Sequence, residues 1–130
     1  MKAVLIDEFG GVEVLKVGEA ERPAPKSDEV LIKVVATSIN RPDLVQREGK
    51  YPPPPGDSEI LGLEVAGTVV ACGDGASGWK IGDHVCALTP GGGYAEYCLA
   101  EAGHCLPVPQ GLPLAEAAAL RVVEIGRAHV

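Results

Sequence analysis

EVLIKVVAT, residues 29–37, is the most strand-like stretch of the sequence. It is apolar and rich in β-branched residues, and Lys33 is expected to point outward from it. A second stretch of the same kind, EVAGTVVAC, covers residues 64–72. Gly67 inside that stretch indicates a bulge or a close approach of another backbone. Together the two stretches predict a β-sheet at the centre of the fold.

Shorter apolar runs flank these two stretches on both sides. Strands are predicted over residues 2–6, 12–17, 83–88 and 94–100, a short helix over 42–47 and a helix over 114–120. Gly (17) and Pro (11) are spread between the apolar runs and predict many turns, including the YPPPPG loop at residues 51–56. We expect one mainly β domain, a compact and partly open β-barrel with few short helices.

Composition excludes several classes of partner. The formal net charge is −7 and no cluster of Lys and Arg occurs, so neither nucleic acid nor an anionic membrane is an expected partner. The N-terminal residues contain no signal-peptide core and no stretch is long enough to span a membrane, which predicts a cytosolic protein. The four cysteines contain no C-x-x-C pair and are predicted to be buried free thiols.

Residues 73–78, GDGASG, match the G-x-G-x-x-G dinucleotide pattern and follow a predicted strand. That fingerprint requires a helix that begins at the glycines and faces the pyrophosphate. Gly82 and the next strand come too soon for such a helix. The stretch therefore predicts a connection between two strands, with glycines supplying positive φ angles.

Candidate binding residues gather between the two central strands, at Asn40, Arg41, Asp43 and Tyr51. Asn40 offers a donor and an acceptor, Arg41 a planar cation and Tyr51 a flat face with a hydroxyl, which together suit a flat, polar ligand. The alternative is structural: Asn40 caps the short helix, Asp43 favours its first turn and Tyr51 packs on the prolines. Both interpretations stay open on these residues alone. The three histidines lie far apart in sequence and fit no hydrolytic pattern.

Several motifs occur together in one order along the chain: EVLIKV at 29–34, NRPD at 40–43, QREGKY at 46–51, ILGLEVAG at 60–67, GDHV at 82–85, GGGYAEY at 91–97 and EAAA at 116–119. With these motifs, the chain to about Leu120 resembles the N-terminal half of the medium-chain dehydrogenase/reductase superfamily. The zinc-free quinone oxidoreductase branch is the most similar.

The resemblance implies a GroES-like β-barrel catalytic domain over residues 1–120. Complete members continue into a Rossmann domain, which is absent from this chain. The implied activity is NADPH-dependent reduction of quinones or enones, and a homodimer stays open for the full-length protein. Asn40, Asp43 and Tyr51 are implied to line the substrate and cofactor cleft, with Asn40 and Tyr51 orienting substrate or cofactor and Asp43 holding the loop.

The resemblance also implies that no metal is bound. Zinc-dependent relatives have a cysteine where this chain has Asn40 and a Gly-His-Glu where it has Gly62-Leu63-Glu64. Leu63 cannot ligate zinc and Asn40 is a poor ligand. Glu64 is then expected to be a structural carboxylate or one that supports the site from behind.

Beyond Leu120 the family pattern is lost. Residues 121–130 match nothing expected there, and residues 124–130, EIGRAHV, can be back-translated to a common sequencing-library adapter. This gives the hypothesis that the chain is a gene fragment read into adapter sequence, with little or no activity alone because one wall of the cofactor cleft is missing. The alternative is a stand-alone module that binds a small molecule or a protein on the same barrel, and a weaker one is a co-chaperonin subunit.

Overall fold

The computed structural model describes residues 1–6, 10–38, 47, 60–76, 78–108 and 111–113. Its strands are β1 (Lys2–Ile6), β2 (Leu15–Glu19), β3 (Glu29–Thr37), β4 (Glu64–Cys72), β5 (His84–Leu88), β6 (Tyr97–Glu101) and β7 (Cys105–Pro107). Two 3₁₀ turns accompany them, η1 (Val12–Val14) and η2 (Ala102–His104). In these ranges no helix is long and apolar enough to cross a membrane.

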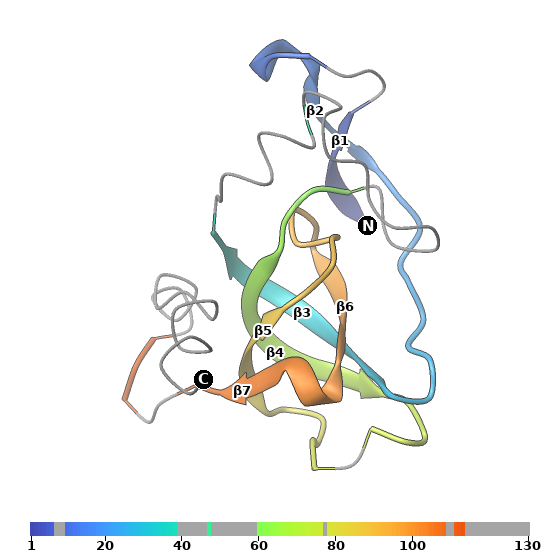
Figure 1. Ribbon diagram of the computed structural model, residues 1–130, viewed down its shortest axis with the longest axis vertical. Coiled ribbons are helices and arrows are strands. Elements are labelled where there is room, and N and C mark those ends of the chain that lie inside the picture. Colours follow the sequence, from blue (N-terminus) through green and yellow to red (C-terminus); the bar gives the residue numbers. More distant parts are fainter. Residues whose placement is uncertain (7–9, 39–46, 48–59, 77, 109–110, 114–130) are drawn as a thin grey trace.

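Five strands form one antiparallel sheet in the order β6-β3-β4-β5-β7, and β1 pairs with β2 in a separate ribbon. The large sheet curls on itself without joining its edge strands β6 and β7, as Figure 1 shows. The ribbon is attached beside it by an isolated bridge between Ala3 and Ala95 and by a hydrogen bond from the Val4 amide to the Tyr94 carbonyl, 2.8 Å long. The predicted mainly β, partly open barrel is confirmed.

The core lies on the inner face of this curled sheet. Alternate residues of neighbouring strands fill it, and Val30, Ile32, Val65, Val69 and Val85 are each 0% exposed. Lys33 is exposed, as its position in the strand pattern predicts. A period of two places these side chains on one face of the sheet, while the intervening Ala66 and Cys86 are buried in a second cluster.

Gly67 allows β3 and β4 to approach closely. A Cβ at this position would overlap the carbonyl oxygen of Lys33 and would lie 2.8 Å from Cγ2 of Ile32. The β3–β4 register also shifts between Val34 and Ala36, beside the partner of Gly67. The bulge or close approach predicted for this glycine is confirmed, and both features occur.

The GDGASG stretch connects two antiparallel strands, β4 and β5, and its described residues form no helix. Gly78 and Gly82 have φ angles of 93° and 99°. The predicted connection between two strands is confirmed.

Four details differ from the predicted strands. Val12–Val14 form a 3₁₀ turn rather than the start of a strand, because the Gly11 amide donates to Oε1 of Glu13 and the Val14 amide donates to the Gly11 carbonyl. Strand β5 (His84–Leu88) begins one residue after the predicted start and ends where predicted, whereas β6 (Tyr97–Glu101) is displaced from the predicted 94–100. The short β7 has no predicted counterpart. Apart from Arg47, which is helical, the predicted helices at 42–47 and 114–120 lie outside the described residues.

Candidate functional site at the ends of the central strands

The turn before β4 is bound to the glycine-rich loop after β5. We call residues 60–63 the Gly62 turn and residues 90–93 the glycine loop. Amides of the loop and of the residue after it donate to three consecutive carbonyls of the turn: Gly92 to Ile60 at 2.8 Å, Tyr94 to Leu61 at 2.9 Å and Gly93 to Gly62 at 3.1 Å. Two motifs that are distant in sequence therefore form one rigid unit.

Gly62 has to be a glycine in this unit. Its φ is 108°, in the left-handed region that side chains rarely adopt. A Cβ there would lie 2.7 Å from Cα of Gly93 and from the amide nitrogen of Tyr94, both backbone atoms. The close approach of the turn and the loop therefore depends on the missing side chain.

Glu64 follows the turn and anchors the end of β3. Glu64 is only 1% exposed. Its carbonyl oxygen accepts a 2.6 Å hydrogen bond from Oγ1 of Thr37 and a 3.4 Å hydrogen bond from the Ser38 amide. Burial raises the pKa of the Cys86 thiol, a backbone hydrogen bond partly opposes that rise, and the negative charge of Glu64 adds to it. A buried position in the supporting structure fits the structural role expected for Glu64.

Thr89 joins the same unit, and the sequence did not single it out. It is 4% exposed; its amide donates to the Leu63 carbonyl at 2.7 Å and its Oγ1 to the Gly62 carbonyl at 3.3 Å. Both bonds fix the backbone on either side of Leu63, the residue that replaces a zinc-ligating histidine in the resemblance. The sequence signal that could have pointed to Thr89 is a single polar residue between a strand and a Pro-Gly turn.

Asn40, Asp43 and Tyr51 lie outside the described residues. The structure instead shows how the segment that carries them is attached. Its beginning is held where Ser38 bonds to Glu64, its end where Ile60 bonds to Gly92, and Arg47 within it bonds to Gly10. The structure therefore describes the supports of the predicted site rather than its predicted contacts.

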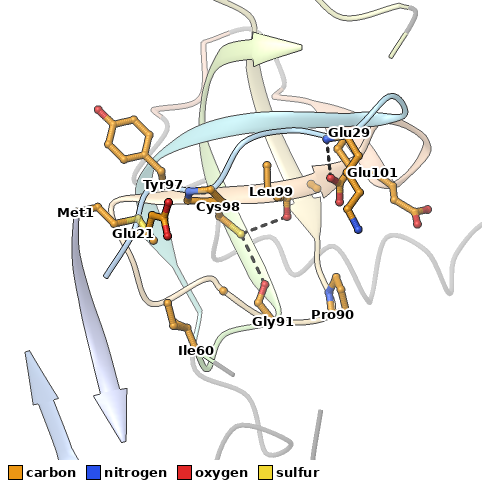
Figure 2. Close-up of a pocket in the computed structure, with 14 residues that line it drawn as sticks. Met1, Glu21, Glu29, Ile60, Pro90, Gly91, Tyr97, Cys98, Leu99 and Glu101 are labelled. Atoms are coloured by element: carbon orange, nitrogen blue, oxygen red, sulfur yellow. Dashed lines mark hydrogen bonds between the residues drawn. The ribbon is translucent and has the colours of Figure 1, made fainter. Parts of the chain in front are cut away.

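A pocket of about 250 Å³ is lined in part by Ile60 and by residues 90–92 of the glycine loop. Figure 2 shows Ile60 and Gly91 on one side of it and the β6 residues Cys98 and Leu99 on the other. The Cys98 thiol donates to the Gly91 carbonyl (3.7 Å) and to the Leu99 carbonyl (3.4 Å). Burial raises the pKa of Cys98 to about 12, against a smaller opposing effect of the Thr89 hydrogen bond. This thiol is therefore protonated at neutral pH and is a poor nucleophile.

The other cysteines follow the same pattern. All four are free; Cys86, Cys98 and Cys105 are buried, which confirms that part of the prediction, while Cys72 is only half-buried. Burial also raises the pKa of Cys105, to about 11. Within the described ranges, no group of three or more His, Cys, Asp and Glu side chains is placed to hold a metal ion.

A second, apolar groove of about 580 Å³ runs between the β1–β2 ribbon and the end of β3. Val4, Val17, Val34 and Val35 are among its lining residues. Val17 is 76% exposed and Val35 is 52% exposed, which is unusual for large apolar side chains. Lys2, Thr37 and Glu96 add a few polar groups to a lining that is mainly apolar, and such a surface resembles one for contact with other protein.

Comparison with known proteins defines the class. Residues 26–110 match the family described as the alcohol dehydrogenase GroES-like domain. The chain belongs to this family, and with it to the medium-chain dehydrogenase/reductase superfamily.

Among individual relatives, quinone oxidoreductase from Rattus norvegicus is 41% identical over 124 residues, which are 94% of this chain and 38% of the rat protein. The structure of Escherichia coli quinone oxidoreductase complexed with NADPH is similar with a TM-score of 0.83 and 30% identity, over 92% of this chain and 36% of that one. The CurK enoyl reductase structure has a TM-score of 0.79 at 26% identity, over 92% of this chain and 38% of that one. The chain thus spans less than half the length of these relatives.

Proposed function

We propose that this chain is the catalytic-domain part of an NADPH-dependent oxidoreductase that reduces quinones or related enones. The observation that carries the proposal is the 41% identity to the rat quinone oxidoreductase along 94% of this chain. The NADPH complex of the Escherichia coli protein supports the choice of cofactor, and the similarity to an enoyl reductase supports enones as an alternative substrate.

Asn40 and Tyr51 are the residues proposed to orient the substrate or the nicotinamide, and Asp43 is proposed to line the same cleft and hold its loop. A quinone already accepts hydride readily, so the protein has to align it, exclude water and donate hydrogen bonds to the oxygen that gains charge. The Asn40 amide and the Tyr51 hydroxyl can both donate such bonds. The anchoring of Ser38 on Glu64 supports this assignment, because Asn40 is only two residues further along the chain.

NADPH would supply the hydride, but the described residues do not form its main binding site. The GDGASG turn connects antiparallel strands and its described residues carry no helix for a pyrophosphate. Zinc does not fit the turn either, because Leu63 stands at the position of a ligand in zinc-dependent relatives. We therefore propose a zinc-free domain over residues 1–120 that needs a further cofactor-binding domain, followed by a tail, residues 121–130, that does not belong to the family.

The four free cysteines support a cytosolic location for this protein, since a reducing compartment keeps thiols unpaired. A homodimer stays a proposal for the full-length protein. Sequencing the parent locus tests the fragment hypothesis: an open reading frame that continues beyond residue 120 into a strand, a Gly-rich turn and a helix supports it, and a natural stop codon after Val130 contradicts it.

The activity test compares this chain with the full-length protein. Each is titrated with NADPH by fluorescence, and NADPH consumption is then followed after addition of a simple para-quinone. We expect binding and turnover only for the full-length protein, with kcat/KM reduced about 10- to 100-fold in Asn40→Ala and Tyr51→Phe, the loss typical of an orienting or oxyanion-binding donor. Steady turnover by the 130-residue chain would show that the second domain is dispensable.

A stand-alone binding module is the second candidate, because the apolar groove that contains Val17 and Val35 is open to solvent. In that case the parent gene would end without a cofactor domain, and the groove would bind an apolar partner. Protection of groove residues from hydrogen exchange by such a partner would favour the module, whereas quinone turnover by the full-length protein would favour the oxidoreductase.

A further inference from the structure

Strand β2 forms the outer edge of the β1–β2 ribbon, which lies at the opposite end of the molecule from β7 in Figure 1. Strand β1 has neighbours on both sides. Beyond its pairing with β2, its Val4 amide donates to the Tyr94 carbonyl at 2.8 Å and its Lys2 carbonyl accepts from the Glu96 amide at 3.0 Å. Among the described strands, β2 pairs with β1 alone, so its other edge is open.

The hydrogen-bond pattern of the ribbon shows which groups of β2 face the open edge. In antiparallel strands, opposite residues alternately bond to each other or direct their amides and carbonyls away from each other. The Val4 amide bonds to Tyr94, so Val4 and its cross-strand partner Val17 are a pair of the second kind. The amide and carbonyl of Val17 therefore point away from β1, and by the same period of two so do those of Leu15 and Glu19. Within the described ranges, no hydrogen bond reaches these main-chain groups.

The side chains along this edge do little to block another strand. Val17 is 76% exposed, and Leu15 and Val17 both line the apolar groove. Proline and β-bulges commonly prevent edge pairing in natural sheets. The strand contains no proline, and its register with β1 contains no bulge. Strand β2 thus combines open main-chain groups with an exposed apolar side chain.

A second copy of β2 fits this edge. Because only outward-facing groups can bond across it, Leu15, Val17 and Glu19 of one copy have to face the same three residues of the other. An antiparallel arrangement centred on Val17 meets this condition along all 5 residues of the strand, pairing Val17 with Val17, Leu15 with Glu19 and Lys16 with Gly18. Centring on Lys16 would place two lysines directly opposite each other, and centring on Gly18 would place Val17 opposite a charged Glu19.

The arrangement centred on Val17 is also favourable for packing and charge. It has two-fold symmetry, so every contact except the central one occurs twice. Side chains of Leu15 and Val17 from both copies lie on one face, where each Val17 covers the other and the two apolar grooves adjoin. The strand contains one Lys and one Glu, so it adds no net charge to the contact between two molecules that each carry −7.

We propose that two copies of this chain associate by antiparallel pairing of their β2 strands, centred on Val17. The two ribbons then form one continuous sheet in the order β1-β2-β2-β1. An interface one strand wide is small, so the association is weak and depends on protein concentration. This inference rests on the geometry of the ribbon and not on the proposed oxidoreductase function.

The association is measured first on the unmodified 130-residue chain. Sedimentation equilibrium from about 10 μM to about 1 mM covers the range of weak contacts, in about 0.15 M salt to screen the negative charge of each copy. We expect the mass to rise from that of a monomer toward that of a dimer. A chain that stays monomeric throughout this range overturns the proposal.

Hydrogen exchange followed by NMR locates the interface without any substitution. Between the lowest and the highest concentration we expect exchange of the Leu15, Val17 and Glu19 amides to slow about fivefold. The amides of Lys16 and Gly18 face β1 and should not change. A dimer in which the outward-facing amides exchange as fast as in the monomer would place the contact elsewhere and overturn the proposal.

Charge substitutions at the centre test the register. In Val17→Lys and in Val17→Glu, like charges would face each other across the two-fold axis, and we expect each variant alone to associate about tenfold more weakly. An equal mixture of the two variants should associate nearly as well as wild type, because opposite charges then meet. Val35→Lys is the matched control: Val35 is a 52% exposed strand valine outside β2, and its replacement should leave association unchanged.

The remaining outcomes are equally decisive. Undiminished association of both Val17 variants would overturn the β2 interface, and a mixture that fails to associate would overturn the register centred on Val17. In the full-length protein, protection of the Leu15, Val17 and Glu19 amides at every concentration would show that another part of the protein occupies the edge. That result would overturn a second copy as its partner.

Discussion

Replacement of Gly67 by alanine is expected to destabilise this domain by about 2–3.5 kcal/mol. The new Cβ would overlap the Lys33 carbonyl oxygen and lie 2.9 Å from the Lys33 carbonyl carbon and 2.8 Å from Cγ2 of Ile32. Two of these three atoms belong to the backbone of β3, so no change of side-chain rotamer relieves the overlap. Strand β3 would have to move away from β4.

The magnitude follows from what that movement disrupts. Separation of the strands at this point breaks about two ladder hydrogen bonds, each contributing about 1 kcal/mol. It also loosens the packing of Ile32, which is 0% exposed, at a further cost of about 1–2 kcal/mol. Alanine lowers the conformational entropy of the unfolded chain relative to glycine, which offsets about 0.5–1 kcal/mol of the loss in stability. Since small domains have a total stability of about 5–15 kcal/mol, the loss is large.

Urea unfolding followed by circular dichroism and by fluorescence of the single tryptophan, Trp79, measures this free energy. Gly103→Ala is the matched control, because nothing lies within 4 Å of its Cβ position and Gly103 is not among the glycines with positive φ. We expect the control to be unchanged or stabilised by up to about 1 kcal/mol. A Gly67→Ala domain within about 0.5 kcal/mol of wild type would refute the close-approach argument.

Three smaller predictions concern single contacts. Trp79→Phe should cost about 1 kcal/mol in urea unfolding, since its indole N–H donates to the Ala102 carbonyl at 2.9 Å. Burial raises the pKa of Cys98 from 9.0 to about 12, so as pH rises the unfolded chain loses this thiol proton before the folded chain does. The free energy of unfolding should therefore fall between about pH 9 and pH 12. Measured under reducing conditions, the fall should be steeper than in Cys98→Ala. Val17→Thr should change the unfolding free energy by less than about 0.5 kcal/mol, because Val17 is 76% exposed and threonine keeps the β-branch; a larger loss would mean that Val17 packs in solution.

The central strands could be predicted from sequence because every local signal agrees there. In β3 and β4 the apolar composition, the β-branched residues and the flanking turns all favour a strand, and the predicted bounds match the structure. The prediction failed at η1 because the Glu13 carboxylate bonds to the Gly11 amide and closes a turn that alternation does not reveal. It missed β7 because three residues ending in proline carry no pattern, and only pairing with β5 makes them a strand.

The contacts that support the proposed site join residues that are distant in sequence. Thr89 bonds to Gly62 across 27 residues and Arg47 bonds to Gly10 across 37, so neither contact leaves a local pattern. Family motifs could point to the segment that carries the proposed site residues, yet they could not say which described residues bond to the ends of that segment.

The described hydrogen bonds attach the segment 39–59 to residues outside it. Thr37 and Ser38, which precede it, bond to the Glu64 carbonyl, and Glu64 directly follows a turn in which Gly62 has a φ of 108°. Its middle depends on the β1–β2 ribbon through Gly10. Substitutions far from any substrate contact, at the Gly62 turn or at η1, should therefore alter substrate affinity through the position of the segment, a class of effect that motif matching alone does not anticipate.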